Sequence, residues 1–290
     1  MKFTKMQGIG NDNIYVNWFE EPVPADPAAL SRRLSDRRFG IGGDGLILIR
    51  PTPNGDAMMD LYNADGSRAK MCGNGIRCVG RYVYERGIAR REELRIDTLS
   101  GVKTLKLDTE NGTVRSIEVD MDAPILVPEQ IPVRLPGDRA VGLPIEVNGR
   151  TVRVTCVSMG NPHCVLFVDD VEKAPLESLG PMLEHHPLFP DGVNVEFVQI
   201  LARDDIRMRV WERGSGETWA CGTGACASLV ASVLCGHADR AATLHLRGGD
   251  LSIRWEEESD HVFMRGPAAF VVTEKGTLEP KKKEREEQGA

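Results

Sequence analysis

Four short polar or glycine-rich motifs occur twice in this 290-residue chain, in the same order and at a nearly constant separation. The matched residues are Asn11 and Asn161 (150 positions apart), Asp44 and Asn194 (150), Asn63 and Glu212 (149), and Cys72 and Cys221 (149). One match between glycine-rich turns would be uninformative. Four matches in register predict a single structural unit of about half the chain that is used twice.

The hydrophobic pattern predicts many short strands and few helices. Most apolar segments are β-branched or alternate with polar residues, which is typical of strands. Helices are expected at four places, Pro27–Phe39, Gly75–Arg86, Leu176–His186 and Gly224–Leu234. Because strands outnumber helices and the two do not alternate regularly, the fold class predicted is α+β, not a doubly wound sheet.

The composition excludes several classes of protein. There are 36 Lys and Arg against 43 Asp and Glu, a net charge of −7, which argues against a nucleic-acid or anionic-membrane partner. The longest apolar runs fall well short of the roughly 20 residues that cross a membrane. The first 12 residues lack the apolar segment of a secretory signal, and the last ten (KKKEREEQGA, 281–290) predict a disordered, charged tail.

The seven cysteines are expected to be free thiols in the cytoplasm, because seven is an odd number and no secretory signal is seen. No CxxC pair is present and no histidine has zinc-site spacing, so no metal is expected. Most of the cysteines lie within apolar runs, where a buried packing role is predicted. These are Cys78, Cys156, Cys164, Cys226 and Cys235.

Cys72 and Cys221 are different, because each begins a Cys-Gly-x-Gly turn that leads into an apolar helix. A thiol at the start of a helix faces the positive end of the helix dipole, so we expect its pKa to be lowered. The glycines allow the N–H groups of the first turn to bind an anion such as a carboxylate. The alternative is that both are structural cysteines beside glycine turns.

If the two repeats face each other, Cys72 and Cys221 meet across one cleft. Two acid/base groups on opposite faces of a carbon atom can remove a proton from one side and return one from the other, which inverts the centre. The ordinary thiol pKa, about 8.5, is close enough to neutrality for thiol and thiolate to coexist. This arrangement predicts stereochemical inversion.

Further polar residues lie on the expected loops around these turns. They are Asn11, Asn63, Asn161, Asn194, Glu212 and Arg213, with His163 as a supporting group. Each asparagine could instead cap a helix or form a turn, and Arg213 could form a surface ion pair with Glu212. A purely structural role for His163 is equally open.

Seven segments carry a family resemblance: residues 3–12, 40–45, 62–67, 71–78, 160–163, 193–195 and 212–226. Together they resemble the diaminopimelate epimerase family. The resemblance implies a cofactor-independent epimerase that converts LL- to meso-2,6-diaminopimelate, for lysine and peptidoglycan precursors, as a homodimer. It also implies two pseudo-symmetric domains, each a β-sheet or barrel wrapped around a central helix. The domains expected are 1–123, with 268–280 returning to it, and 124–267.

The resemblance also assigns roles residue by residue. Cys72 and Cys221 correspond to the acid/base pair. The residues that correspond to substrate-binding positions are Asn11, Asn63, Gly73, Asn74, Asn161, Asn194, Glu212, Arg213, Gly222 and Thr223. Two positions depart from the pattern: some members carry Gln at Gly45, and an aromatic or apolar residue is common at Asn13.

Two other functions are weighed. A racemase of proline or histidine could use the same scaffold, but proline racemases carry His where this chain has Asn74. Alternatively, two facing low-pKa cysteines could form a disulfide in a dithiol redox sensor. Turnover of proline, histidine and diaminopimelate distinguishes the racemase from the epimerase. Activity measured before and after oxidation distinguishes the redox sensor.

Overall fold

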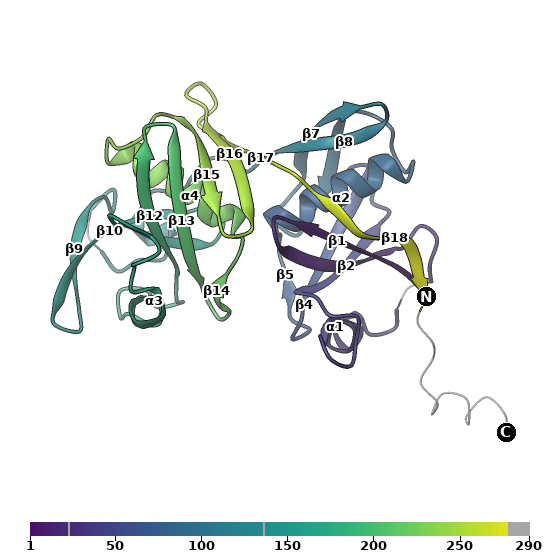
Figure 1. Cartoon of the computed structure of the whole chain (residues 1–290), viewed down its shortest axis with the longest axis horizontal. Helices are drawn as coiled ribbons and strands as arrows, with labels where there is room; N and C mark the ends of the chain where they lie inside the picture. Colours follow the sequence, from purple (N-terminus) through teal and green to yellow (C-terminus); the bar gives the residue numbers. More distant parts are fainter. Residues whose placement is uncertain (23, 136, 278–290) are drawn as a thin grey trace.

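The computed structural model of the chain describes residues 1–22, 24–135 and 137–277, the last five by their backbone alone. The tail expected at 281–290 lies outside the described residues. The chain forms two lobes that lie side by side (Figure 1). Two connections pass between them, and the C-terminal strand ends beside the N-terminus on the first lobe.

The first lobe holds two helices and most of the N-terminal strands. Its elements are β1 (Lys2–Gly8), β2 (Asn11–Asn17), α1 (Pro27–Ser35), β3 (Gly45–Arg50), β4 (Ala57–Asn63), β5 (Arg68–Ala69), α2 (Gly73–Glu85), β6 (Glu93–Asp97), β7 (Lys103–Glu110), β8 (Thr113–Asp120) and, from the end of the chain, β18 (Ala269–Thr277).

The second lobe repeats this order. A short 3-10 helix, η1 (Pro128–Gln130), precedes it. Its elements are β9 (Leu143–Val147), β10 (Arg150–Ser158), β11 (Pro162–Phe167), α3 (Leu176–Glu184), β12 (Asn194–Ala202), β13 (Asp205–Glu212), β14 (Gly216–Thr218), α4 (Gly222–Leu234), β15 (Ala241–Leu246), β16 (Gly249–Trp255) and β17 (Val262–Gly266).

The strand pairing is the same in the two lobes. In the first, β1 and β2 are antiparallel, β2 and β3 parallel, β3 and β4 antiparallel, and β4 continues in parallel to β6. In the second, β10 and β11 are antiparallel, β11 and β12 parallel, β12 and β13 antiparallel, and β13 pairs in parallel with β15. One antiparallel pairing, between β8 and β17, joins the two sheets across the seam.

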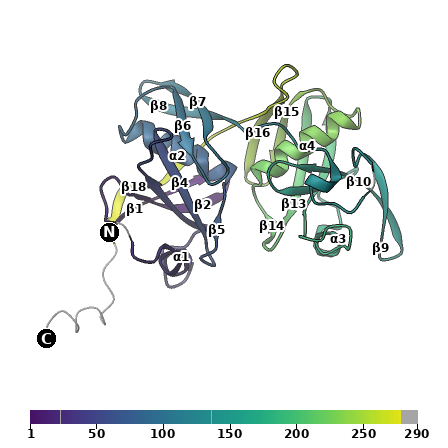
Figure 2. The same ribbon diagram turned by 180° about the vertical axis from the view of Figure 1, so that it is seen from behind.

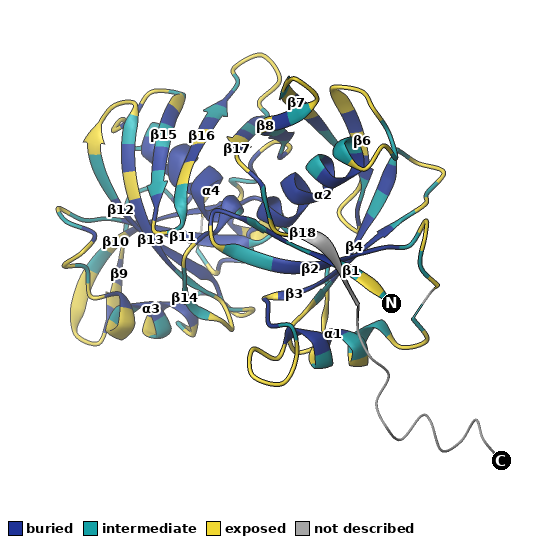
Figure 3. Cartoon of the chain, turned by 45° about the vertical axis from the view of Figure 1, so that its right-hand side comes forward, coloured by how far each residue is buried: buried dark blue, intermediate teal, exposed yellow. Residues whose placement is uncertain are grey.

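One helix lies at the centre of each sheet, α2 in the first lobe and α4 in the second (Figure 2). Both are almost entirely buried, as the dark ribbon segments in Figure 3 show. Residues 14–16 of β2 and 46–49 of β3 are apolar on both faces, because the sheet is covered twice there. Tyr15, Ile47 and Ile49 pack with α2, whereas Ile14, Val16, Leu46 and Leu48 pack with Leu34 of α1.

The predicted fold class is confirmed: the protein is α+β, with two similar lobes in which a sheet surrounds a central helix. All four predicted helices are present. Two of them begin two residues earlier than expected, at Gly73 and Gly222, because the cysteine before each glycine is the N-cap. None of the described helices is long and apolar enough to span a membrane.

Candidate active site

The two cysteine turns have the same local geometry. Cys72 is the N-cap of α2, and its Sγ accepts a hydrogen bond from the Gly75 N–H at 3.3 Å. Cys221 is the N-cap of α4, and its Sγ accepts from the Gly224 N–H, also at 3.3 Å. A sulfur in this position takes the place of the usual Ser, Thr or Asp oxygen. Both thiols therefore lie at the positive end of a buried helix.

The two helix starts converge at the seam between the lobes. A β-carbon placed on Gly73 would lie 3.7 Å from the Cα of Gly222, so a side chain there would press against the opposite turn. Asn74 joins the turns directly, because its Nδ2 donates to the carbonyl oxygen of Ala220 at 3.0 Å. The first-turn N–H groups of α2 and α4 are thus brought to one place, where an anion can be bound.

Burial raises the pKa of both thiols, so the lowered values expected from the sequence are wrong. At Cys72, the backbone N–H groups of Gly75 and Asn74 oppose this effect but do not outweigh it. The pKa of Cys221 is raised well above its ordinary value, by burial first and then by the carboxylates of Glu212 and Glu196. The hydrogen bonds donated to each sulfur at the helix start are weaker here than the cost of burying a thiolate.

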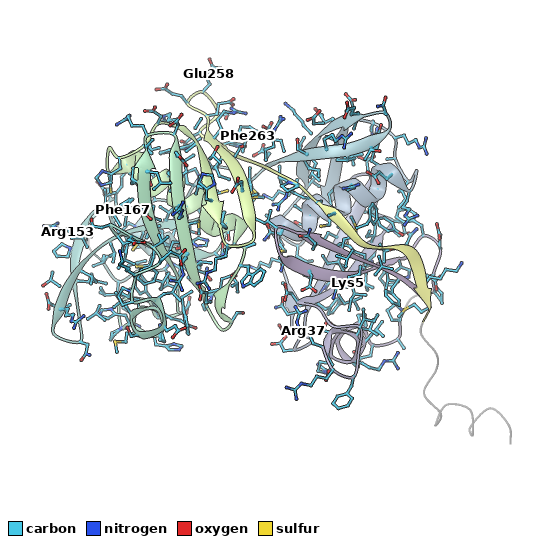
Figure 4. The ribbon with its side chains drawn as sticks, in the orientation of Figure 1. Lys5, Arg37, Arg153, Phe167, Glu258 and Phe263 are labelled. Atoms are coloured by element: carbon cyan, nitrogen blue, oxygen red, sulfur yellow. The ribbon has the colours of Figure 1, made fainter. Side chains whose placement is uncertain are left out.

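Asn11 lies beside the first thiol. The Cys72 Sγ–H points to Asn11 Oδ1 at 3.5 Å, and Asn11 Nδ2 donates to Asp44 Oδ2 at 2.7 Å. Asp44 also accepts from Arg37 at 3.0 Å. Arg37 and Lys5, both labelled in the first lobe in Figure 4, in turn form ion pairs with Asp12. This network fixes the Asn11 amide with its oxygen toward the sulfur.

The two departures from the family pattern, Asn13 and Gly45, are neighbours. They are directly opposite in the parallel pairing of β2 and β3. A β-carbon on Gly45 would lie 2.4 Å from the Tyr62 carbonyl oxygen and 3.2 Å from Asn13 Oδ1, so this position has no room for a side chain. Asn13 is buried and donates to Asn11 Oδ1 at 3.0 Å. Its role is to orient Asn11.

On the second lobe, a buried histidine lies between two oxygen atoms. His163 Nδ1 is 2.7 Å from Glu196 Oε1, and its Nε2 is 3.0 Å from Asn161 Oδ1. Glu196 is fully buried and its second oxygen, Oε2, has no hydrogen-bond partner among the described residues. A β-carbon on Gly224 would lie only 2.7 Å from Glu196 Oε1, so this carboxylate lies directly beneath the second cysteine turn.

The remaining second-lobe residues form a connected set. Asn194 is buried; its Nδ2 donates to the Pro162 carbonyl oxygen and its Oδ1 accepts from the Arg213 N–H, each at 3.0 Å. Arg213 is exposed, with Nη1 on the Asp191 carbonyl oxygen at 2.7 Å. Glu212 accepts a hydrogen bond from the Thr218 hydroxyl, and burial raises its pKa. Thr223 Oγ1 is 3.5 Å from the Cys221 sulfur.

The chain matches the family model described as diaminopimelate epimerase over residues 3–127 and 155–271. The chain belongs to the diaminopimelate epimerase family. It is 54% identical over 271 residues to the diaminopimelate epimerase of Acetivibrio thermocellus, covering 93% of this chain and 96% of that protein. The corresponding enzyme of Moorella thermoacetica is 55% identical over 271 residues, covering 93% of this chain and 97% of the relative.

Two solved structures with the same fold are more distant in sequence. A probable proline racemase from Agrobacterium radiobacter has a TM-score of 0.71 at 18% identity, covering 97% of this chain and 94% of that one. A predicted epimerase from Pseudomonas aeruginosa has a TM-score of 0.69 at 16% identity, covering 97% and 99%. At these identities the likeness shows the fold alone. The epimerase family, not the racemase fold, therefore identifies the chemistry: the protein is an amino-acid epimerase, an isomerase.

Asn63 is, with Arg213, one of the exposed residues among those predicted for the site. It is exposed at the end of β4, opposite Gly45 in the pairing with β3. Its Nδ2 donates to the Ser67 hydroxyl at 3.0 Å. The amide oxygens of Asn11 and Asn194, by contrast, accept hydrogen bonds from Asn13 and from the Arg213 N–H.

The described residues contain one group of side chains that could offer three metal ligands, Asp120, Asp122 and His261. This group lies where β8 and β17 pair, and its members already form ion pairs or hydrogen bonds with one another or with a lysine. His261 Nδ1 is 2.9 Å from both oxygens of Asp120, and Lys103 forms an ion pair with Asp122. The group is not part of the cysteine turns.

The buried packing role predicted for five cysteines is confirmed for four of them, Cys78, Cys156, Cys164 and Cys226. Cys235 is only partly buried, since it is the C-cap of α4 and its sulfur lies 3.3 Å from Thr155 Oγ1.

Sequence analysis missed two charged residues near the epimerase site, Glu196 and Arg77. Both lie in apolar segments that form the core, where a charge is rarely buried without a purpose. A charged residue inside an apolar segment was therefore the sequence signal that could have identified them.

Proposed function

We propose that this protein interconverts LL- and meso-2,6-diaminopimelate by a two-base mechanism in which Cys72 and Cys221 are the acid/base pair. The supporting observation is the pair of sulfur-capped helix starts that meet at the seam of two similar lobes. Each turn offers both a thiol and free N–H groups, and neither lobe alone would supply two proton-transferring groups to opposite faces of one carbon atom.

In the proposed reaction, one sulfur accepts a proton and the other donates one. The thiolate of one cysteine removes the α-hydrogen as a proton, and the electron pair left on carbon is delocalised into the adjacent carboxylate. The thiol of the other cysteine then gives its proton to the opposite face. One S–H bond forms and one breaks, so no cofactor takes part in the inversion. Proton transfers of this kind typically accelerate a reaction by about 10² to 10⁴-fold each.

The substrate carboxylate at the reacting carbon is held by the turns themselves. Negative charge grows on this carboxylate when the proton leaves, and the N–H groups of Gly73, Asn74, Gly222 and Thr223 are already oriented toward an anion. These groups need not move during the reaction, because the helices are packed in the core. Stabilising the charged intermediate is therefore the role proposed for the first turn of each helix.

The remaining polar residues are proposed to bind the distal amino-acid end of the substrate. The guanidinium of Arg213 can pair with a carboxylate through two parallel hydrogen bonds. Asn11, Asn63, Asn161, Asn194 and Glu212 supply amide and carboxylate groups for the ammonium and carboxylate of that end, and His163 orients Asn161 and supports the second turn.

A substrate panel tests the proposal. Purified protein is incubated separately with LL-diaminopimelate, proline and histidine, and the stereoisomers are separated by chiral chromatography. We expect conversion of LL-diaminopimelate to an equilibrium mixture with the meso form, and no comparable inversion of the other two amino acids. Faster inversion of proline or histidine would contradict the proposed substrate.

Three further properties are proposed on the same family resemblance. The enzyme forms a homodimer, it acts in the cytoplasm, where its seven free cysteines stay reduced, and its domains are 1–123 with 268–280, and 124–267. Light scattering after size-exclusion chromatography tests the dimer. A molar mass equal to the 31.9 kDa chain mass would exclude it under those conditions.

A further inference from the structure

A fully buried arginine lies directly behind the first cysteine turn. Arg77 is on α2, five residues after Cys72, and has no exposed surface. Its guanidinium donates to the Gly73 carbonyl oxygen at 3.1 Å, to Asn74 Oδ1 at 2.9 Å and to the Pro267 carbonyl oxygen at 3.1 Å. All three acceptors are neutral. A buried charge is ordinarily paired with an opposite charge, so this arrangement needs a reason.

Two glycines, which have no side chain, leave space for the Arg77 guanidinium. A β-carbon on Gly8 would lie 3.1 Å from Arg77 Nη2, and one on Gly266 would lie 3.2 Å from Nε. The sulfur of Met264 is 3.7 Å from Nη1. Strands from both ends of the chain thus enclose the charge without supplying a carboxylate.

Among the described residues, the titratable groups with the strongest electrostatic effect on Arg77 are three thiols and a phenol. Cys72 and Cys78 are on its own helix, Tyr15 is on β2, and Cys226 is on α4. Among the described residues no carboxylate forms an ion pair with Arg77. Burial raises the pKa of Cys78 to about 11 and that of Cys226 to about 12, and the pKa of Tyr15 is raised well above its ordinary value. These three groups are neutral at neutral pH.

Cys72 differs from the other two thiols in position. It is at the helix start, accepts the Gly75 N–H, and is partly exposed, so water and substrate can reach it. The carboxylate that faces it is Glu212 of β13, which opposes ionisation, and Arg77 favours it. Cys72 is the one neighbour of Arg77 that can become an anion without a fully buried charge.

We propose that Arg77 is a positioning residue whose buried, carboxylate-free charge makes the Cys72 thiolate its counter-ion. The proposal rests on the proposed function, in which Cys72 transfers a proton. The Cys72 thiol releases its proton to water and the resulting anion is stabilised by the guanidinium. When the thiolate takes a proton from the substrate, Arg77 loses this counter-ion. The positive charge of Arg77 therefore favours the thiolate form of Cys72, which is the form that can act as a base.

Arg77 also connects the two turns. Its Nη2 holds the oxygen of the Asn74 amide, and the nitrogen of the same amide donates to the carbonyl oxygen of Ala220, the residue before Cys221. A purely structural role for Arg77 would depend on these hydrogen bonds alone. The proposed role depends on the charge as well, and an experiment can separate the two.

The test measures alkylation of each cysteine by iodoacetamide as a function of pH, with the modified peptides quantified by mass spectrometry. This readout does not depend on turnover, so it can fail independently of the proposed function. In the wild-type enzyme Cys72 should react at lower pH than Cys221. In Arg77→Gln, which keeps a hydrogen-bond donor but no charge, Cys72 should react about tenfold more slowly at neutral pH. Arg77→Lys, which keeps the charge, should stay close to wild type.

Arg81→Gln is the matched control, because Arg81 lies on the same helix and already has a carboxylate partner, Glu85, at 2.9 Å. It should leave the Cys72 profile unchanged. Equal Cys72 profiles in Arg77→Gln and wild type would overturn the proposal. If Arg77→Gln does not fold, the wild-type measurement still decides, since ionisation of Cys221 before Cys72 would overturn it as well.

Discussion

The two cysteine turns have the same backbone geometry but different electrostatic surroundings. At the position that corresponds to Arg77 in the first helix, the second helix carries Cys226, 149 residues later. Beneath the first turn, a β-carbon on Gly75 would meet the methyl group of Ile47, whereas one on Gly224 would meet the carboxylate of Glu196. Glu212 opposes ionisation of both thiols. Arg77 partly offsets this effect at Cys72, whereas a second carboxylate, Glu196, adds to it at Cys221.

This difference shows how a duplicated unit can perform two different steps. Symmetry of the helices supplies two thiols and two sets of N–H groups for one carboxylate. Asymmetry of the charges makes thiolate formation easier at Cys72 than at Cys221. The two-base mechanism that we propose needs one base and one acid at any moment, and the unequal surroundings favour Cys72 as the base before substrate binds.

The largest expected effect comes from removing either sulfur. Cys72→Ala and Cys221→Ala should each lower turnover by at least about 10³-fold, because each removes one of the two proton-transferring groups. Circular dichroism and thermal unfolding check that the variants fold, and chiral chromatography measures the product. Cys235→Ala is the control, since Cys235 lies at the far end of α4. Substantial epimerisation by either active-site variant would contradict the two-base mechanism.

The buried thiols of the two central helices predict a loss of stability in alkali. The folded-state pKa values of Cys78 and Cys226, about 11 and about 12, lie above the ordinary range of a thiol, which is about 8.5 to 9. The native chain therefore binds more protons than the unfolded chain above pH 9, and the stabilisation present in full below pH 9 is lost as the pH rises toward 12. For Cys226 this amounts to as much as about 4 kcal/mol.

Urea unfolding at a series of pH values from 8 upward measures this effect. Cys226→Ala should flatten the decline in the free energy of unfolding more than Cys78→Ala does, because Tyr15 lowers the pKa of Cys78 through a hydrogen bond. A stability that stays constant between pH 8 and 11, or an equal effect of both substitutions, would disagree with this difference between the helices.

A smaller effect is expected from Glu196→Gln. Its carboxylate raises the pKa of Cys221, so removal of the charge should allow Cys221 to be alkylated several-fold faster at a fixed pH and leave Cys72 unchanged. Glu184→Gln is a suitable control. Glu184 is also buried in the second lobe, but it binds Trp211 Nε1 at 2.7 Å and the Gly214 N–H at 2.8 Å. A similar rate increase in both variants would show that the effect is not specific to Glu196.

The sequence predicted the repeat, the fold class and both cysteine turns, because these depend on local patterns that occur twice. It could not predict the ionisation of the thiols. The helix dipole is visible in the sequence, but the burial that outweighs it results from contact between the two lobes. Arg77 and Glu196 were missed for a related reason: a charge in an apolar segment indicates burial, but it does not indicate that the buried charge will lie next to a cysteine. Asn13 and Gly45 looked like two unrelated departures until the parallel pairing of β2 and β3 placed them opposite each other.

The most direct test of the account is the position of deuterium after LL-diaminopimelate is converted in D2O. With two bases, the proton removed by one cysteine stays on that sulfur, and the new hydrogen comes from the other, which has exchanged with solvent. The meso product formed early in the reaction should therefore carry deuterium at the inverted carbon, while the remaining LL substrate keeps its hydrogen. Meso product that retains the substrate's own hydrogen would show that a single group removes and returns the proton, and would contradict the roles assigned to Cys72 and Cys221.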